Sequence, residues 1–317
     1  MNDASAENSG SASGGPHKPS FRERFHAWWE GYELAAAPET VEPVETRRSG
    51  EKGPPPTVRE WPKERLELVQ SIFGEGMVGP GRAEDLLRMI KPLGLDEKMT
   101  VLEIGAGLGG FARLVTEDTG AYVTAFEPVP ALVAAGNEIS TRHGKGRKAR
   151  ILPAPKGHFE ARQKSVDAII GKEALFAITD KAELFSAVRK ALKPGGQVTM
   201  TDYMLVGDPN SDEYQAWLAS EPFTPDLLTP AVTRSRLEEL GLEVRVLEDL
   251  TDEYRAAALS AFADYAEKIR NEAPDEYKSA WALSEGELWS RRLAILQSGV
   301  VKLYRLYARL PGVKELT

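Results

Sequence analysis

The chain has 317 residues, and its 42% hydrophobic and 28% charged content is typical of a globular protein. Its formal net charge of −8 opposes binding to nucleic acid, so we expect no nucleic-acid partner. It contains no cysteine and four histidines without ligand-like spacing, which excludes disulfides and thiol chemistry and argues against a metal site. The sequence has no apolar run of about 18 residues and no secretory signal. We therefore expect a cytoplasmic protein.

The N-terminal part, residues 1–57, is predicted to be a disordered tail that carries one short helix. Its first 20 residues are mostly small and polar. At about 21–34, aromatic residues recur at helical spacing: Phe21, Phe25, Trp28, Trp29 and Tyr32. This amphipathic helix can pack on the main domain, or it can make a peripheral membrane or protein contact. The oligomeric state stays open.

Residues 58–317 are predicted to form a single α/β domain. Two helices, Glu64–Ile72 and Arg82–Ile90, flank a glycine-rich segment at 73–81. Short apolar runs then alternate with helical patterns, as a mostly parallel sheet with helices on both faces requires. We expect strands at Thr100–Ile104, Tyr122–Phe126, Ala149–Leu152, Val166–Ile170, Gln197–Leu205 and Leu242–Leu247, and a last strand at Val301–Leu310. A helical stretch at about 253–297 is predicted as an inserted cap or interface.

The strongest motif is the run from Val101 to Gly110, in which a buried strand enters a glycine-rich turn and then a helix. Gly105, Gly107 and Gly109 allow the backbone to approach a ligand closely, and the helix N-terminus supplies N–H groups. Gly105, Gly107 and Gly110 also match the dinucleotide fingerprint. The motif alone therefore leaves NAD and S-adenosylmethionine both open.

Three details favour S-adenosylmethionine. Glu103 ends the strand, where it can accept from an amino-acid ammonium that NAD lacks. Glu127 ends the next strand, where a carboxylate can hold ribose hydroxyls. Asp167–Ile170 and Leu192–Gly196 then follow in order. From residue 64 to 205 the chain resembles the class I S-adenosylmethionine-dependent methyltransferases, which have a Rossmann-like, mostly parallel seven-stranded sheet. The resemblance implies that the last strand, Val301–Leu310, runs in the reverse direction near one edge. The resemblance implies cofactor contacts from Val78, Gly79, Glu103, Gly105, Ala106, Gly107, Gly109, Glu127, Pro128 and Gly171.

Within this class the chain is most similar to the phosphoethanolamine and glycine-sarcosine N-methyltransferase-like group. The similarity lies in Phe73–Gly81, Asp167–Phe176 and Thr201–Tyr203. In that group the glycine-rich segment folds over the cofactor. The resemblance implies that Glu173 faces the substrate amine as the catalytic carboxylate, with Lys172 and Tyr203 beside the substrate. The alternative is that the Glu173 carboxylate only stabilises the loop or forms an ion pair with Lys172.

Several positions depart from that group. Ala177 and Trp61 match a His and a Tyr that form a catalytic latch in the phosphoethanolamine enzymes, and Val69 matches another Tyr. Trp61 can instead wall a cationic substrate. The stretch Leu152–Pro155 lacks the acidic residue that often holds adenine. The resemblance to that group therefore supports the same fold and cofactor site more strongly than the same substrate.

The sequence predicts a methyltransferase acting on a small molecule, with an amine ahead of a hydroxyl or a carboxylate as acceptor. Two alternatives stay open: a lipid-directed methyltransferase, motivated by the aromatic helix at 21–34, and a non-catalytic protein that keeps the fold for regulation or as a scaffold.

Overall fold

The structure is a computed structural model that describes residues 60–154, 161–270 and 276–312. The predicted tail and its aromatic helix at about 21–34 lie outside the described residues, and so does Pro155.

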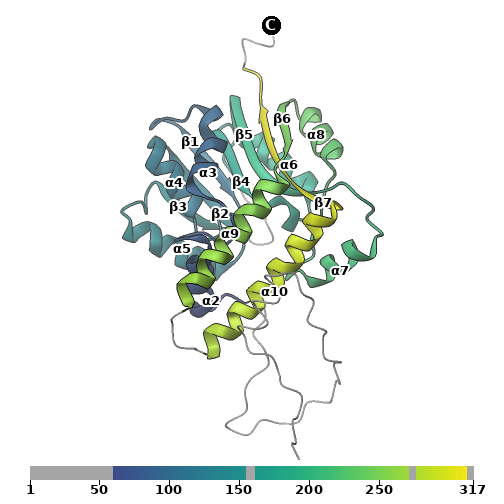
Figure 1. Ribbon diagram of the computed structural model, residues 1–317. Helices are drawn as coiled ribbons and strands as arrows, with labels where there is room; N and C mark the ends of the chain where they lie inside the picture. Colours follow the sequence, from purple (N-terminus) through teal and green to yellow (C-terminus); the bar gives the residue numbers. More distant parts are fainter. Residues whose placement is uncertain (1–59, 155–160, 271–275, 313–317) are drawn as a thin grey trace, which may run out of the picture. The chain divides into compact units, whose positions relative to one another are not determined.

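A seven-stranded sheet with the order β3-β2-β1-β4-β5-β7-β6 forms the centre of the domain (Figure 1). All strand pairs are parallel except those of β7, which lies antiparallel between β5 and β6. The predicted mostly parallel sheet with a reversed last strand is thus confirmed. The strands are β1 (Thr100–Ile104), β2 (Tyr122–Glu127), β3 (Ala149–Pro153), β4 (Val166–Lys172), β5 (Leu192–Leu205), β6 (Glu243–Asp249) and β7 (Val301–Arg309).

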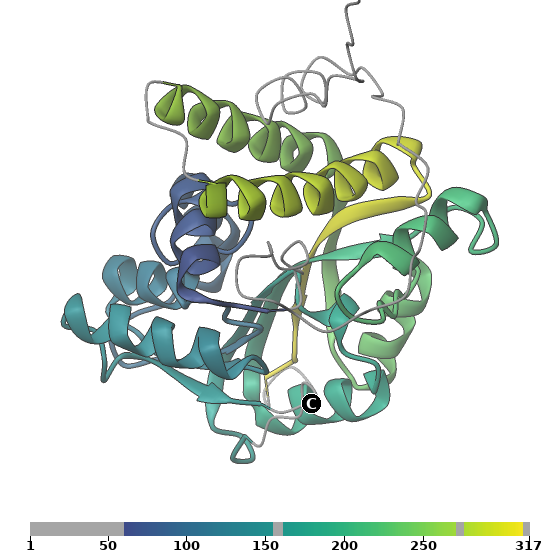
Figure 2. The ribbon, with the colours of Figure 1, turned by 90° about the horizontal axis from the view of Figure 1, so that it is seen from below.

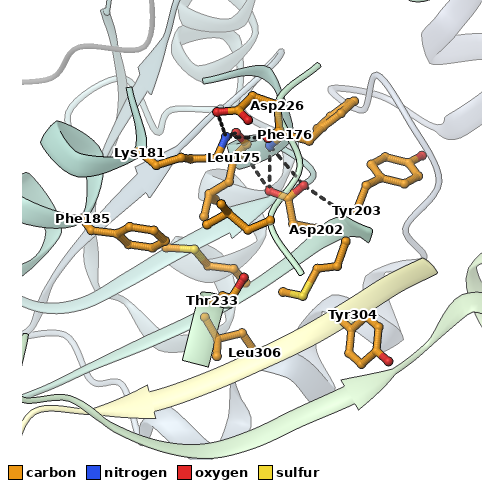
Figure 3. A pocket seen from close by; sticks show the side chains of 13 residues that line it. Leu175, Phe176, Lys181, Phe185, Asp202, Tyr203, Asp226, Thr233, Tyr304 and Leu306 are labelled. Carbon is orange, nitrogen blue, oxygen red and sulfur yellow. Dashed lines mark hydrogen bonds and ion pairs between the residues drawn. The ribbon is translucent and has the colours of Figure 1, made fainter. Parts of the chain in front are cut away.

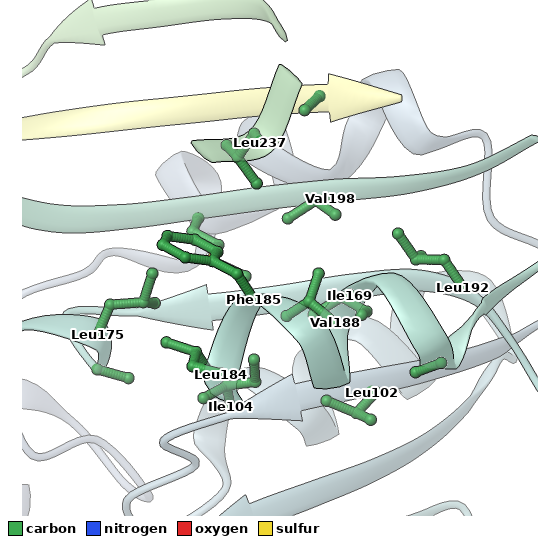
Figure 4. Packing of buried hydrophobic residues seen from close by; sticks show 14 of the residues in the cluster. Leu102, Ile104, Ile169, Leu175, Leu184, Phe185, Val188, Leu192, Val198 and Leu237 are labelled. Carbon is green, nitrogen blue, oxygen red and sulfur yellow. The ribbon is translucent and has the colours of Figure 1, made fainter. Parts of the chain in front are cut away.

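Helices cover both faces of this sheet, because each central strand buries side chains on both of its sides. On one face, α3 (Ala83–Ile90) and α4 (Gly110–Thr119) pack on Val101 of β1 and its neighbours. On the other face, α6 (Lys181–Ala191) and α8 (Pro230–Glu239) pack on Leu102 and its neighbours (Figure 4). Helix α5 (Pro130–Arg142) runs along β3.

The predicted helical stretch at about 253–297 is two helices, α9 (Thr251–Ile269) and α10 (Glu276–Ser298), inserted between β6 and β7. They run side by side, with α2 (Lys63–Phe73) against both (Figure 2). We call α9 and α10 together the roof. A further helix, α7 (Asp212–Ser220), packs on α10 and was not predicted; the Ser211 side chain caps its N-terminus. No helix among the described residues is long and apolar enough to span a membrane.

Candidate functional site

The glycine turn, residues 105–109, lies where β1 and β2 end. The N–H groups of Gly105 and Ala106 donate to the Phe126 carbonyl at 2.9 and 3.0 Å. The N–H of Gly107 donates to Glu127 Oε2 at 2.8 Å, and the N–H of Val129 donates to Glu127 Oε1 at 2.9 Å. The carboxylate predicted to hold a ribose therefore also fixes the turn, which the sequence did not reveal.

Glycine is required in this turn both by conformation and by space. Gly107 has φ +54°, and a Cβ there would lie 2.8 Å from a methyl group of Val78. Gly109 has φ +74°, and a Cβ there would lie 2.7 Å from Ile151. Left-handed backbone and close approach together leave little room for any other residue.

The glycine-rich segment at 74–81 covers this turn. The Gly110 N–H at the start of α4 donates to the Gly76 carbonyl at 3.0 Å, and the Gly76 N–H donates to the Gln70 side chain at 3.0 Å. Gly79 is buried, and a Cβ built on it would lie 3.4 Å from the Trp289 ring and 3.6 Å from Lys172 Nζ. The segment thus connects the turn to the roof.

Glu103 lies beneath the turn, with its side chain 1% exposed. It shares a strand face with Val101, so alternation along β1 directs it toward α4 and Arg113 rather than out of the strand end. Burial raises its pKa to about 8, against the opposing effect of the Arg113 charge. Its Oε2 has no hydrogen-bond partner among the described residues, so an acceptor is available for a ligand.

The two remaining predicted cofactor residues lie at neighbouring strand ends. Pro128 follows Glu127 and is exposed, whereas Gly171 is buried in β4 opposite Ile104. Burial also raises the pKa of Glu127 to about 7, partly offset by its two backbone N–H donors. The site therefore holds two carboxyl groups whose raised pKa values lie near physiological pH.

Glu173 stands directly after β4, beside the glycine turn. A Cβ on Gly105 would lie 2.3 Å from the Cβ of the next residue, Ala174. Glu173 adopts φ +43°, a left-handed backbone conformation that is unusual for a residue other than glycine. Its Oε1 accepts from Thr201 at 2.7 Å and its Oε2 accepts from Lys172 at 2.5 Å. The predicted pairing with Lys172 is present, and the carboxylate is ordered next to the turn.

The predicted substrate residues Tyr203 and Trp61 do not meet. Tyr203 is 3% exposed and packs on Phe176, with ring centroids 4.7 Å apart. Its hydroxyl lies 3.1 Å from that of Tyr254 on α9. Trp61 stacks on the Arg65 guanidinium at 3.8 Å, so its ring already contacts a cation within the protein.

The sequence missed three residues next to this centre: Thr201, Tyr254 and Arg292. Thr201 was detectable, because it lies two residues before Tyr203 on the same strand face. Tyr254 and Arg292 lie in the roof helices and carry no local signal. Arg292 is held by Glu221 through two hydrogen bonds of 2.8 and 2.6 Å.

The short helix η3 (Leu175–Ala177) follows Glu173 and is capped by Asp202, which accepts from the N–H groups of Leu175 and Phe176. Burial raises the Asp202 pKa to about 7, with opposing contributions from the N–H groups of Tyr203 and Leu175 and from the Lys181 charge. Ala177 is exposed at the end of this helix.

A pocket beneath Asp202 is lined by Lys181, whose ammonium donates to three carbonyl groups (Figure 3). This pocket includes neither the glycine turn nor Glu173, so we assign it no role in the site.

A family model described as a methyltransferase domain matches residues 81–246, which is about half of the chain and includes the glycine turn, Glu127 and Glu173. The chain belongs to the methyltransferase domain family. Among the described residues, no group of acidic and histidine side chains is arranged to hold a metal ion.

Relatives of this methyltransferase-domain chain include phosphoethanolamine N-methyltransferases. It is 30% identical to phosphoethanolamine N-methyltransferase 2 of Caenorhabditis elegans over 50% of the chain and 36% of that protein, so it spans about a third of this relative. It is 25% identical to the Plasmodium falciparum enzyme over 73% of the chain and 85% of that protein. The structure of phosphoethanolamine N-methyltransferase 2 of Haemonchus contortus in complex with S-adenosyl-L-methionine has a TM-score of 0.66 at 20% identity, covering 78% of this chain and 56% of that one. This last similarity confirms the Rossmann-like methyltransferase fold.

Proposed function

We propose that this chain is an S-adenosylmethionine-dependent methyltransferase that acts on a small amine. The observation that carries the proposal is an ordered carboxylate, Glu173, whose chain neighbour Ala174 packs against Gly105 of the glycine turn. The family match and the names of the relatives support the same reaction.

The turn and its surroundings fit the cofactor. Glu103 Oε2 is a buried acceptor without a partner, which suits an ammonium group. Each Glu127 oxygen accepts one N–H and keeps a second lone-pair site, which suits ribose hydroxyls. Gly105, Ala106, Gly107 and Gly109 provide close backbone approach, while Val78, Gly79, Pro128 and Gly171 surround the turn. When bound, the cofactor supplies an activated methyl group.

The residues of the chain then bind, orient and deprotonate the acceptor. Displacement at a sulfonium methyl group needs positioning and exclusion of water more than covalent catalysis. A protonated amine must lose a proton before it can attack, and the Glu173 carboxylate orients that amine or accepts the proton. The Lys172 side chain packs against the glycine-rich segment at Gly79, so together they can cover the site.

Calorimetry with S-adenosylmethionine and S-adenosylhomocysteine tests the cofactor, with Glu127→Ala as the binding variant. Mass spectrometry of reactions with phosphoethanolamine, sarcosine and dimethylglycine tests the acceptor. We expect Glu173→Gln to lower kcat by about 100-fold or more, as loss of a general base does, with cofactor binding retained. Glu238→Gln removes an exposed carboxylate of α8 that pairs with Arg234 and serves as the control. Cofactor binding without transfer to any amine would favour the lipid-directed or scaffold alternative.

A further inference from the structure

We propose that Tyr254, supplied by the roof helix α9, is a positioning residue that holds the Glu173 carboxylate in its working orientation. Its hydroxyl lies 3.3 Å from Glu173 Oε2 and 3.1 Å from the hydroxyl of Tyr203. The inference rests on the proposed function, because it assigns the orientation of the carboxylate that receives the amine.

The direction of the hydrogen bonds follows from the number of protons. Burial raises the pKa of both Tyr203 and Tyr254, and the nearby Glu173 carboxylate adds to this effect, so both phenols stay protonated. A charged carboxylate only accepts, so the single Tyr254 proton points to Glu173. Tyr203 must then donate to Tyr254. The chain of donors runs from β5 through the roof to the end of β4.

Counting lone pairs shows which oxygen is left for a substrate. Glu173 Oε2 accepts from both Lys172 and Tyr254, so its two lone-pair sites are used. Oε1 accepts from Thr201 and keeps one site. With Tyr254 in place, the carboxylate presents that remaining site in one direction.

The charged group of the roof near these tyrosines does not substitute for this donor, because the Arg292 guanidinium of α10 is engaged by Glu221. At the two positions that match the latch of the related enzymes, Ala177 has no donor side chain and the Trp61 ring lies on Arg65. Among the described residues, the hydroxyl of Tyr254 is thus the contact through which the roof reaches this carboxylate.

The test compares Tyr254→Phe and Tyr203→Phe with Tyr307→Phe. The control, Tyr307→Phe, removes a hydroxyl that donates to Gln197 at 2.6 Å. Gln197 pairs with Ala168 near the beginning of β4, whereas Glu173 follows the end of β4. Each protein is assayed with S-adenosylmethionine and the amine panel named above across a pH range. In parallel, a ¹³C-carboxyl-glutamate NMR titration follows the Glu173 signal in protein saturated with S-adenosylhomocysteine, with Glu173→Gln providing its assignment.

We expect Tyr254→Phe to lower kcat by about 10-fold or more with KM changed less than about 3-fold, because orientation is lost while binding is kept. In Tyr254→Phe, the acidic limb of the pH–rate profile and the midpoint of the Glu173 NMR titration should both move to higher pH, because the charged carboxylate loses a hydrogen-bond donor. Tyr203→Phe should show a smaller change in the same direction, and Tyr307→Phe none.

An unchanged kcat, rate profile and Glu173 signal in Tyr254→Phe, with normal cofactor binding, would overturn the proposal. A fall in kcat without movement of the Glu173 signal would also contradict it, because Tyr254 would then act elsewhere. If wild type methylates no amine but the Glu173 signal still moves, the proposed function fails while the positioning by Tyr254 holds.

Discussion

The glycine turn and the roof both bury carboxylates, but they treat them differently. In the roof region, Glu285 bonds to Arg65 and Glu221 bonds to Arg292, so each buried negative charge contacts a buried guanidinium. Next to the turn, Glu103 and Glu127 form no ion pair within 4 Å among the described residues; Glu127 accepts two backbone N–H groups, and Glu103 Oε2 accepts no hydrogen bond there. The comparison indicates that the carboxylates at the roof are neutralised by the protein's own arginines, whereas Glu103 keeps an acceptor that a ligand can use.

Breaking an ion pair of the roof should give the largest effect. Arg65 and Glu285 are each 2% exposed, so Arg65→Met leaves an uncompensated buried charge. We expect it to lower the free energy of unfolding in urea by about 3–5 kcal/mol. The double variant Arg65→Met/Glu285→Met should recover most of this loss.

The matched control is Arg236→Met, which removes an exposed partner of Glu239 and should cost less than about 1 kcal/mol. Similar losses in Arg65→Met and Arg236→Met would show that the buried pair does not stabilise the roof.

The next effect concerns the turn and is measured in cofactor binding. Gly107→Ala places a Cβ 2.8 Å from Val78 at φ +54°, so both the turn and the segment above it must shift. We expect the calorimetric affinity for S-adenosylhomocysteine to fall by about 10-fold or more, equivalent to about 1.4 kcal/mol. Gly94→Ala has nearly the same strain, with φ +59°, but no atom within 4 Å of the new Cβ. Equal affinity in the two variants would mean that close approach at Gly107 is not needed.

The last expected effect is the response of stability to pH, which is spread over several pH units. The pKa values of Glu103, Glu127 and Asp202 are raised in the fold to about 8, 7 and 7, above the ordinary values of 4.5, 4.5 and 3.8 for these side chains. The folded state therefore binds more protons than the unfolded state between about pH 4 and 8, and stability falls as pH rises through that range. We expect the melting temperature without cofactor to be several degrees higher at pH 6 than at pH 8.

Glu103→Gln should reduce this slope, because it removes the group with the highest of the three pKa values. A melting temperature that rises from pH 6 to pH 8 would contradict the raised pKa values, because it would show that burial of these charged carboxylates does not destabilise the fold. Cofactor binding should also weaken as pH falls below about 7, where Glu127 becomes protonated and loses an acceptor site.

The same contrast explains what the sequence could predict. The glycines of the turn are close together in the sequence, so their spacing predicts Gly105 and Gly107 as cofactor residues, and β1 has the bounds that its apolar run predicts. Alternation predicts β7 as a strand, and its reversed direction follows from the resemblance to the class I methyltransferases. The sequence analysis gives no direction for the Glu103 side chain, because it considers the strand end without the face of the strand.

The roof could not be predicted in the same way. Its contacts join residues far apart in the sequence, such as Arg65 with Glu285 and Tyr254 with Glu173, and helical periodicity does not tell which partner a buried side chain meets. The break between α9 and α10 and the whole of α7 were missed for the related reason that helix ends depend on local caps such as Ser211.

The insertion point of the roof has a consequence for evolution. The chain leaves the sheet after Asp249 and returns at Val301, and Asp249 is paired with Tyr304 across β6 and β7. The insertion therefore begins and ends at neighbouring points, so it can be lengthened, shortened or exchanged without changing strand register. Acceptor preference can thus diversify by grafting new helices at one site, while the strands that carry the glycine turn are inherited unaltered.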